Sequence, residues 1–143
     1  MSRRNGTAID AVRHFNRFYT RHIGVLDEGH LQSPYSLAEV RVLYELAHRN
    51  HATAVEVGKD LGLDAGYLSR ILRRFAREGL LKRQRAPHDR RQTLLSLSAK
   101  GARVFAPLND GARRQVSALL APLSAAERRA LISAMRRIET LLR

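Results

Sequence analysis

The sequence predicts a mainly helical protein of the α+β class with one β-hairpin, and three observations lead to this. Apolar residues recur at three- and four-residue spacing over most of the chain, which is the period of an amphipathic helix. One stretch, residues 80–97, instead reads as two short strands around a turn that contains Pro and Asp. A length of 143 residues is a usual size for one domain, so we expect a single folding unit.

The first predicted helix starts near Thr7, which can cap it together with Asp10. Its broad apolar face comprises Ile9, Val12, Phe15, Tyr19 and Ile23. Residues 24–35 contain two glycines and a Ser-Pro pair, so they are predicted to form a connection.

The second and third predicted helices are short. The spacing of the apolar residues predicts the second helix, whose face comprises Leu37, Val40, Leu43, Tyr44 and Ala47. The polar residues 49–51 then interrupt the pattern. Thr53 and Glu56 form a capping box that opens the third helix, and Gly62 ends it.

The fourth predicted helix covers residues 65–77, with Asp64 as its N-cap and Gly79 after its end. One side carries the apolar residues Leu68, Ile71, Leu72 and Phe75. The opposite side carries Gly66, Arg70, Arg73 and Arg77. Two short helices joined by a glycine-containing turn, with arginines on the second, are typical of a helix-turn-helix that enters the DNA major groove.

The positive charge of the chain is concentrated in this region. The formal net charge is +13, and residues 67–92 alone carry nine basic and two acidic residues, a net +7. Residues 36–66, in contrast, carry a net −2. A local excess of this kind indicates a polyanionic partner, although a solvated charged surface is the alternative interpretation.

The predicted hairpin follows the fourth helix directly. In its return strand Leu95 and Leu97 alternate with Ser96, and the turn at residues 86–91 is basic. A hairpin in this position is the wing of a winged helix-turn-helix, and its arginines can reach the minor groove or the phosphate backbone.

Two further helices are predicted at the C-terminus, one after Ser98 and one capped by Ser124 with Glu127. The first has an apolar face of Val104, Phe105, Leu108, Ala112, Val116 and Leu119. The second has a stripe of Leu131, Met135, Ile138 and Leu142. A small wing domain cannot easily cover these stripes, so we expect a dimer interface; a hairpin within one chain is the alternative.

The segments DAGYLSRILRRFAREGLLKR and DRRQTLLSLSAKG, with the order of the helices around them, resemble the multiple antibiotic resistance regulator (MarR) family over essentially the whole chain. The resemblance implies one domain, 1–143, with a DNA-binding lobe at 36–97 and dimerisation helices at 1–35 and 98–143. It implies a homodimer on a pseudo-palindromic DNA operator, acting as a repressor, and a wing in which Asp89 orients Arg91 for the minor groove.

From the helix geometry and the resemblance together, we predict a set of residues that contact DNA. The set comprises Thr53, Ala65, Gly66, Tyr67, Ser69, Arg70, Arg73, Arg74, Arg77, Arg90 and Arg91, with Asp89 orienting Arg91. Arginine suits this role because its planar fork donates in pairs to guanine acceptors and to phosphates.

The resemblance also implies a small aromatic or lipophilic effector, bound where the dimerisation helices meet the DNA-binding lobe. The candidate residues are Tyr19, His22, Tyr44 and Phe105. The alternative is that these are ordinary core or interface side chains. Ligand binding would favour a spacing of the two recognition helices that no longer matches the DNA.

Several classes of protein are not expected. The chain has no cysteine, no signal-peptide pattern and no segment apolar enough to span a bilayer, so we expect a cytoplasmic, nucleoid-associated protein without thiolate chemistry. The histidines lack metal-ligand spacing, and no catalytic or cofactor motif is evident, so we predict no metal, no cofactor and no enzyme.

Two alternatives stay open. The N-terminal segment IDAVRHFNRFYTRHIGVLDEG also looks like the MarR-type half of proteins that carry a GNAT acetyltransferase. Because the sequence stops at Arg143, we expect a free-standing regulator. The alternatives are a DNA-binding module without effector control and the regulatory part of an acetyltransferase system.

Overall fold

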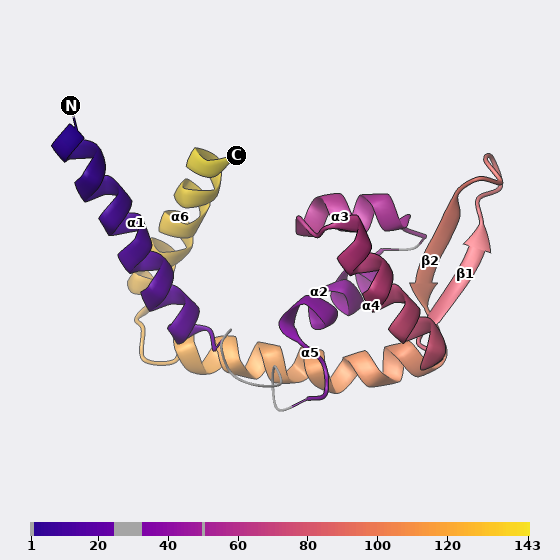
Figure 1. The fold of residues 1–143 in the computed structure, drawn as a ribbon. Coiled ribbons are helices and arrows are strands. Elements are labelled where there is room, and N and C mark those ends of the chain that lie inside the picture. The colour runs from indigo at the N-terminus through magenta and orange to yellow at the C-terminus, as the bar shows by residue number, and fades with distance from the viewer. Residues whose placement is uncertain (1, 25–32, 50) are drawn as a thin grey trace. The chain divides into compact units, whose positions relative to one another are not determined.

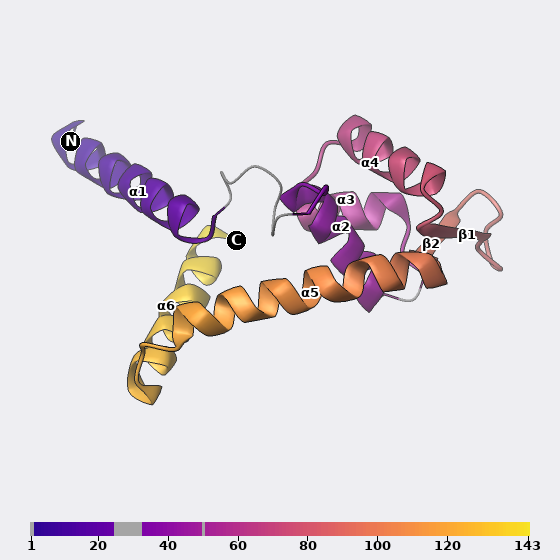
Figure 2. The same ribbon diagram turned by 90° about the horizontal axis from the view of Figure 1, so that it is seen from below.

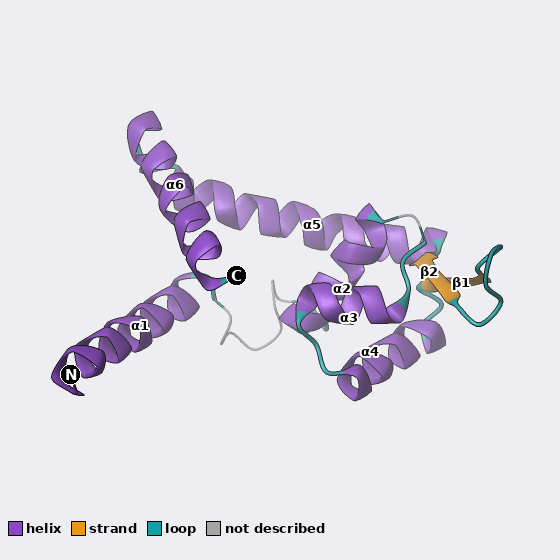
Figure 3. Cartoon of the chain, turned by 90° about the horizontal axis from the view of Figure 1, so that it is seen from above, coloured by secondary structure: helices purple, strands orange, loops and turns teal. Residues whose placement is uncertain are grey.

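The structure, a computed structural model, describes residues 2–24, 33–49 and 51–143, with side chains from residue 6 onward (Figure 1). The elements are α1 (Ser2–His22), α2 (Leu37–His48), α3 (Ala54–Leu61), α4 (Ala65–Arg77), β1 (Leu81–Arg85), β2 (Thr93–Leu97), α5 (Ala99–Leu120) and α6 (Ala125–Leu142). Helices dominate, and among the described residues one antiparallel pair of strands makes up the sheet (Figure 3). The predicted mainly helical fold is confirmed.

The chain divides into two compact units, 1–108 and 109–143, and the division falls inside α5 one residue after Pro107. Among the described residues, no helix combines the length and the apolar character that crossing a membrane requires.

Helix α1 starts earlier than predicted. It begins at Ser2, so Thr7 lies inside the helix and the predicted N-cap at Thr7 is wrong. A capping pattern marks the start of a helix only if the preceding residues are not helical, and here the preceding residues are helical. The predicted connection at residues 24–35 lies outside the described residues at positions 25–32.

The face of α1 stays exposed. Its exposed apolar residues are Ile9, Val12, Phe15, Phe18 and Tyr19. Phe15 stacks on Tyr19, with ring centroids 5.6 Å apart, and Phe18 stacks on His22 at 5.2 Å. These pairs lie at four-residue spacing on the same helix, so they do not need a partner helix to form.

Helices α2, α3 and α4 lie on one side of the first turns of α5 (Figure 2). The predicted capping box of α3 is confirmed, because Thr53 Oγ1 accepts from the Glu56 amide while Glu56 Oε2 accepts from the Thr53 amide. Gly62 ends α3 at φ 64°, a left-handed conformation that favours glycine. Asp64 Oδ2 accepts from the Tyr67 amide at 3.1 Å and caps α4 as predicted.

The hairpin is fixed at its base. The strands pair in the register Leu81 with Leu97 and Arg83 with Leu95. Ala52, in the connection between α2 and α3, forms an isolated bridge with Leu95 through two backbone hydrogen bonds of 2.7 and 3.2 Å. The hairpin is therefore joined to the helix-turn-helix in two ways: β1 follows α4 along the chain, and β2 is hydrogen-bonded to Ala52.

One apolar core fills the lobe. Its fully buried side chains are Phe75, Leu43, Leu80, Val42 and Val57. The core also includes Tyr35, Phe105 and Leu108, which lie outside the predicted lobe boundaries of 36–97. The first turns of α5 thus belong to the packing of the lobe, and a Cβ at Gly101 would collide with the Leu80 carbonyl oxygen.

In the second unit, Ser124 and Glu127 form the predicted capping box at the start of α6. Arg128 Nε donates to the carbonyl oxygens of Leu120 and Leu123, at 3.1 and 3.2 Å, which ties α6 to the end of α5. No residue of α6 is buried. Its exposed apolar residues are Ile132, Ile138, Leu141 and Leu142.

Candidate nucleic-acid interface

Helix α4 has one buried and one basic face, as the sequence predicts. Leu68, Ile71, Leu72 and Phe75 are buried in the core. The exposed residues include Gly66, Ser69, Arg70, Arg73 and Arg77. The guanidinium of Arg70 lies 5.8 Å from the ring centroid of Tyr67, one turn earlier. The helix therefore presents several hydrogen-bond donors away from its own core.

Arg74, one of the predicted DNA contacts, forms ion pairs within the protein. Its Nη1 lies 2.5 Å from Glu39 Oε2, on α2, and its Nε lies 3.4 Å from Glu78 Oε1. The guanidinium also stacks over the Tyr35 ring, 4.7 Å from its centroid. All these partners belong to the protein, because Arg74 lies on the side of α4 that faces α2. The DNA contact predicted for Arg74 stays a prediction.

The Arg74 cluster is held by complementary charges. Burial would lower the pKa of the Arg74 guanidinium, but Glu39 and Glu78 outweigh it and raise that pKa, so Arg74 stays charged. Burial, followed by the charge of Glu78, raises the pKa of Tyr35, whose hydroxyl donates to Glu78 Oε2 at 3.2 Å. The cluster fixes α4 against the start of α2, and this sets the direction in which the exposed arginines project.

In the wing turn, Asp89 contacts the backbone of Arg91. Asp89 Oδ1 accepts a hydrogen bond from the backbone amide of Arg91 at 3.0 Å, and the Asp89 carbonyl oxygen accepts from the Gln92 amide. Within the described residues, no ion pair joins the Asp89 carboxylate to the Arg91 guanidinium. Asp89 thus shapes the turn through the backbone, as aspartates do in Asx turns, and Arg90 and Arg91 are both exposed.

The remaining predicted DNA contacts lie at the starts of α3 and α4. Thr53 lies at the start of α3, where its hydroxyl accepts from Glu56 in the capping box. Ala65, Gly66 and Tyr67 form the exposed first turn of α4. The structure thus groups the predicted set around two features, the outer face of α4 and the wing turn, and their role toward DNA stays a prediction.

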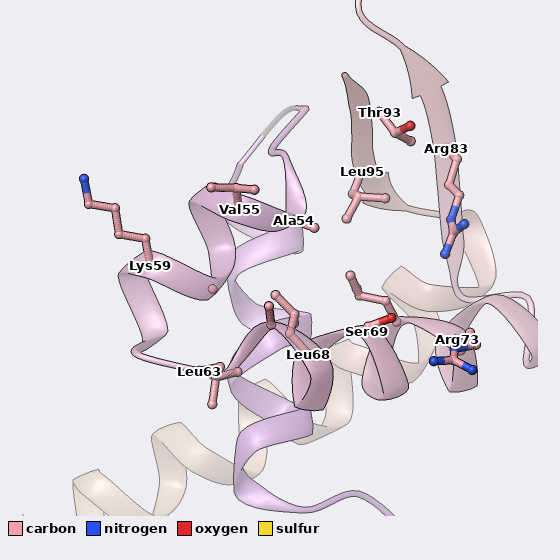
Figure 4. A pocket seen from close by; sticks show the side chains of 13 residues that line it. Ala54, Val55, Lys59, Leu63, Leu68, Ser69, Arg73, Arg83, Thr93 and Leu95 are labelled. Atoms are coloured by element: carbon pink, nitrogen blue, oxygen red, sulfur yellow. The ribbon is translucent and has the colours of Figure 1, made fainter. Parts of the chain in front are cut away.

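A pocket that the sequence does not predict lies between α3, α4 and the hairpin (Figure 4). Its volume is about 480 Å³. The lining residues are Ala54, Val55, Gly58, Lys59, Leu63, Ala65, Leu68, Ser69, Leu72, Arg73, Arg83, Thr93 and Leu95. Arg83 and Lys59 were not among the predicted residues. The strand register could have identified Arg83, because it lies across from the buried Leu95.

Two of the four predicted effector residues meet in the lobe. The rings of Tyr44 and Phe105 pack edge to face, with centroids 6.2 Å apart. His48, which was not predicted, stacks on Tyr44 at 4.0 Å and also contacts Phe105. Tyr19 and His22 instead stack within α1. Over the described part of the chain, no cluster of His, Asp or Glu could hold a metal ion.

Comparisons with known proteins match part of the chain to a family. Residues 33–92 match the model of the MarR family. The chain is similar to the organic hydroperoxide resistance transcriptional regulator of Bacillus subtilis, with 35% identity over 78 residues, 54% of this chain and 50% of that protein. The two curated relatives that the chain matches are covered over only 63% and 50% of their lengths.

Solved structures give the same fold. A crystal structure of a mutant MarR from E. coli, complexed with operator DNA, has a TM-score of 0.76 and 25% identity, and the match covers 92% of this chain and 95% of that one. The PcaV transcriptional regulator from Streptomyces coelicolor, in complex with its natural ligand, has a TM-score of 0.68 and 26% identity, with 93% and 92% covered. The chain thus shares its fold with transcriptional regulators.

Proposed function

We propose, on the premise that residues 33–92 are a MarR-family domain within a winged helix-turn-helix fold, that the chain is a sequence-specific DNA-binding transcriptional regulator of the cytoplasm. The observation that carries the proposal is the outer face of α4. Arg70, Arg73 and Arg77 are exposed there, opposite four buried apolar side chains. A helix of this kind can enter the major groove while the lobe keeps its core intact.

The charge distribution supports the same partner. Residues 67–92, which include α4 and the hairpin, carry a net +7. Such a field attracts the phosphate backbone regardless of sequence, and base contacts then add specificity. The similar MarR structure from E. coli was solved with operator DNA.

We further propose that the regulator is a homodimer. Apolar side chains stay exposed on α1, α5 and α6, among them Val12 at 60%, Val116 at 57% and Leu141 at 65% exposure. Exposed apolar residues at helical spacing indicate an interface. A two-fold dimer binds a pseudo-palindromic operator, with half-site centres about 10 bp apart.

A small aromatic or lipophilic effector that relieves repression completes the proposal. The Tyr44, His48 and Phe105 rings support it, because they form an aromatic surface between α2 and α5, with Tyr44 47% exposed. Tyr19 and His22 stay predicted members of this site. The similar PcaV structure contains its natural ligand. The effector acts if it binds more tightly to the conformation that does not fit DNA.

The test is selection of binding sites from a randomised duplex library, followed by affinity measurement on the selected site. We expect an enriched pseudo-palindrome that the dimer binds. Enrichment of no sequence, or equal binding of a single half-site by a monomer, contradicts the proposal.

A screen of small aromatic compounds against the protein and operator complex tests the effector. We expect a compound that weakens DNA binding by the parent but not by Tyr44→Leu. An operator affinity that no compound changes leaves a DNA-binding module without effector control.

A further inference from the structure

The pocket between α3, α4 and the hairpin has a charge imbalance. Three of its lining residues, Lys59, Arg73 and Arg83, are cationic, and none is acidic. Within the described residues, no ion pair or hydrogen bond engages the guanidinium of Arg73 or of Arg83. Arg74, next to Arg73 in sequence, shows the contrast, since it has two carboxylate partners. The two exposed arginines are therefore available to an external anion.

The strand register determines the direction of Arg83. Cross-strand partners place their side chains on the same face of a sheet, and the partner of Arg83 is the buried Leu95. Arg83 consequently shares the face that turns toward α4. Lys82 precedes it on the strand and pairs with Ser96, so it lies on the other face.

The helix supplies the second cation from the opposite side. Ser69 and Arg73 are four residues apart on α4, so they lie one above the other on the helix surface. Figure 4 shows Arg83 reaching from its strand toward the part of α4 that carries Ser69 and Arg73, while Lys59 extends away from them. Two guanidinium groups and one hydroxyl thus converge on the gap between helix and wing.

DNA geometry specifies what fills such a gap. The major and minor grooves are neighbours that are separated by one phosphodiester backbone. A protein that places a helix in the major groove and a hairpin tip in the adjoining minor groove must straddle that backbone. The gap between α4 and the hairpin is where the backbone passes, and guanidinium groups bind phosphate oxygens in a bidentate manner.

We propose that Arg73 and Arg83 form a clamp for one phosphate of the bound DNA, on the backbone that separates the major groove at α4 from the minor groove at the wing. The proposal rests on the DNA-binding function and adds a specific contact to it. Ser69 donates its hydroxyl to the same phosphate group. The clamp fixes the position of the lobe on the duplex and reads no base.

The first experiment compares Arg83→Gln with Lys82→Gln, which removes the same charge from the other face of the strand. Affinity for a 30-bp duplex of random sequence is measured by fluorescence anisotropy over a range of salt concentrations. The slope of log K against log salt is negative, and one lost phosphate contact lowers its magnitude by about 0.9. We expect this change, with about tenfold weaker binding, for Arg83→Gln and a smaller change for Lys82→Gln. Thermal unfolding by circular dichroism controls for folding.

The second experiment locates the phosphate on the selected operator. Single phosphates of a half-site are replaced in turn by neutral methylphosphonate. In the parent, methylphosphonate at one position between the two groove contacts should weaken binding about tenfold. In Arg83→Gln and in Arg73→Gln, the same substitution should change binding less than twofold, since the contact is already lost; with Lys82→Gln its full effect should persist.

Three results overturn the clamp: equal salt slopes for Arg83→Gln and Lys82→Gln, coupling of Arg73 and Arg83 to different phosphates, or no coupled position. If Arg83→Gln leaves DNA binding unchanged but abolishes binding of inorganic phosphate to the free protein, the pocket is a small-anion site instead. If the proposed sequence-specific function is wrong, the parent itself selects no sequence from the library. The comparison of Arg83→Gln with Lys82→Gln on the random duplex does not need a selected operator, so it still tests the clamp.

Discussion

The lobe and the terminal helices solve the problem of apolar surface in opposite ways. The lobe buries its apolar residues around Phe75 and Leu43, which have no exposed area. Helices α1 and α6 leave theirs exposed, and α6 has no buried residue at all. Hydrophobic burial is the main favourable term in folding, so the lobe can be stable by itself. The terminal helices need another surface, which the proposed dimer provides.

The largest expected effect comes from removing the centre of the lobe core. Phe75→Ala should lower the free energy of unfolding by about 3–5 kcal/mol, because it leaves a cavity among buried side chains. Urea denaturation followed by circular dichroism measures this. A loss below about 1 kcal/mol would show that the lobe does not depend on this core.

A charge on α1 should act on assembly and not on the lobe. Val12→Asp places a carboxylate on the exposed apolar face of α1, and we expect the dimer to weaken at least a hundredfold in sedimentation experiments. His14→Asp is the matched control, since it introduces the same charge on the other side of the helix. Equal effects of the two variants would argue against an interface on this face.

Two arginines on α4 should separate stability from binding. Arg74→Ala removes the ion pair with Glu39 and should cost about 1–2 kcal/mol of stability. Arg70→Ala should change stability by less than about 0.5 kcal/mol but cost about 1–3 kcal/mol of operator binding and relax the preference at one or two base pairs. Denaturation curves and operator titrations of both variants measure this; the reverse pattern would refute the two assignments.

The wing turn offers a finer test. Asp89→Ala removes the acceptor for the Arg91 amide and should weaken binding to all sites by about 1 kcal/mol, although it also removes a negative charge. Asp89→Asn keeps an acceptor oxygen and should bind at least as well as the parent. Tighter DNA binding by Asp89→Ala, with the fold intact, would show that the turn geometry contributes nothing.

The smallest effect concerns the cap of α6. Hydrogen bonds from the backbone and then the side chain of Ser124 lower the pKa of Glu127. A lowered pKa in the folded state means that the carboxylate stabilises the fold above its unfolded pKa and loses this effect as pH falls through the folded pKa. Glu127→Gln, which can still cap but does not titrate, should therefore lose less helicity than the parent below about pH 4.5. Circular dichroism at pH 6 and pH 3 compares them, with Glu139→Gln as control.

The sequence predicts a feature best when the residues that determine it lie close together along the chain. Helix caps such as Thr53 with Glu56, or Asp64, depend on neighbours within three residues, and the structure confirms them. The roles of Arg74 and Arg83 depend on Glu39, 35 residues away, and on the strand partner Leu95. No helical period encodes such contacts, so the sequence predicts neither the ion pairs of Arg74 nor the place of Arg83 beside the pocket.

The absence of a side chain at Gly101 has a mechanical consequence. The first turn of α5 lies directly against the Leu80 carbonyl, at the residue before β1. Protein cores are close-packed and transmit small displacements. At this joint the two backbones meet with no side chain between them, so we expect a tilt of the start of α5 to displace the chain at the start of β1. Any residue larger than glycine would push the two segments apart.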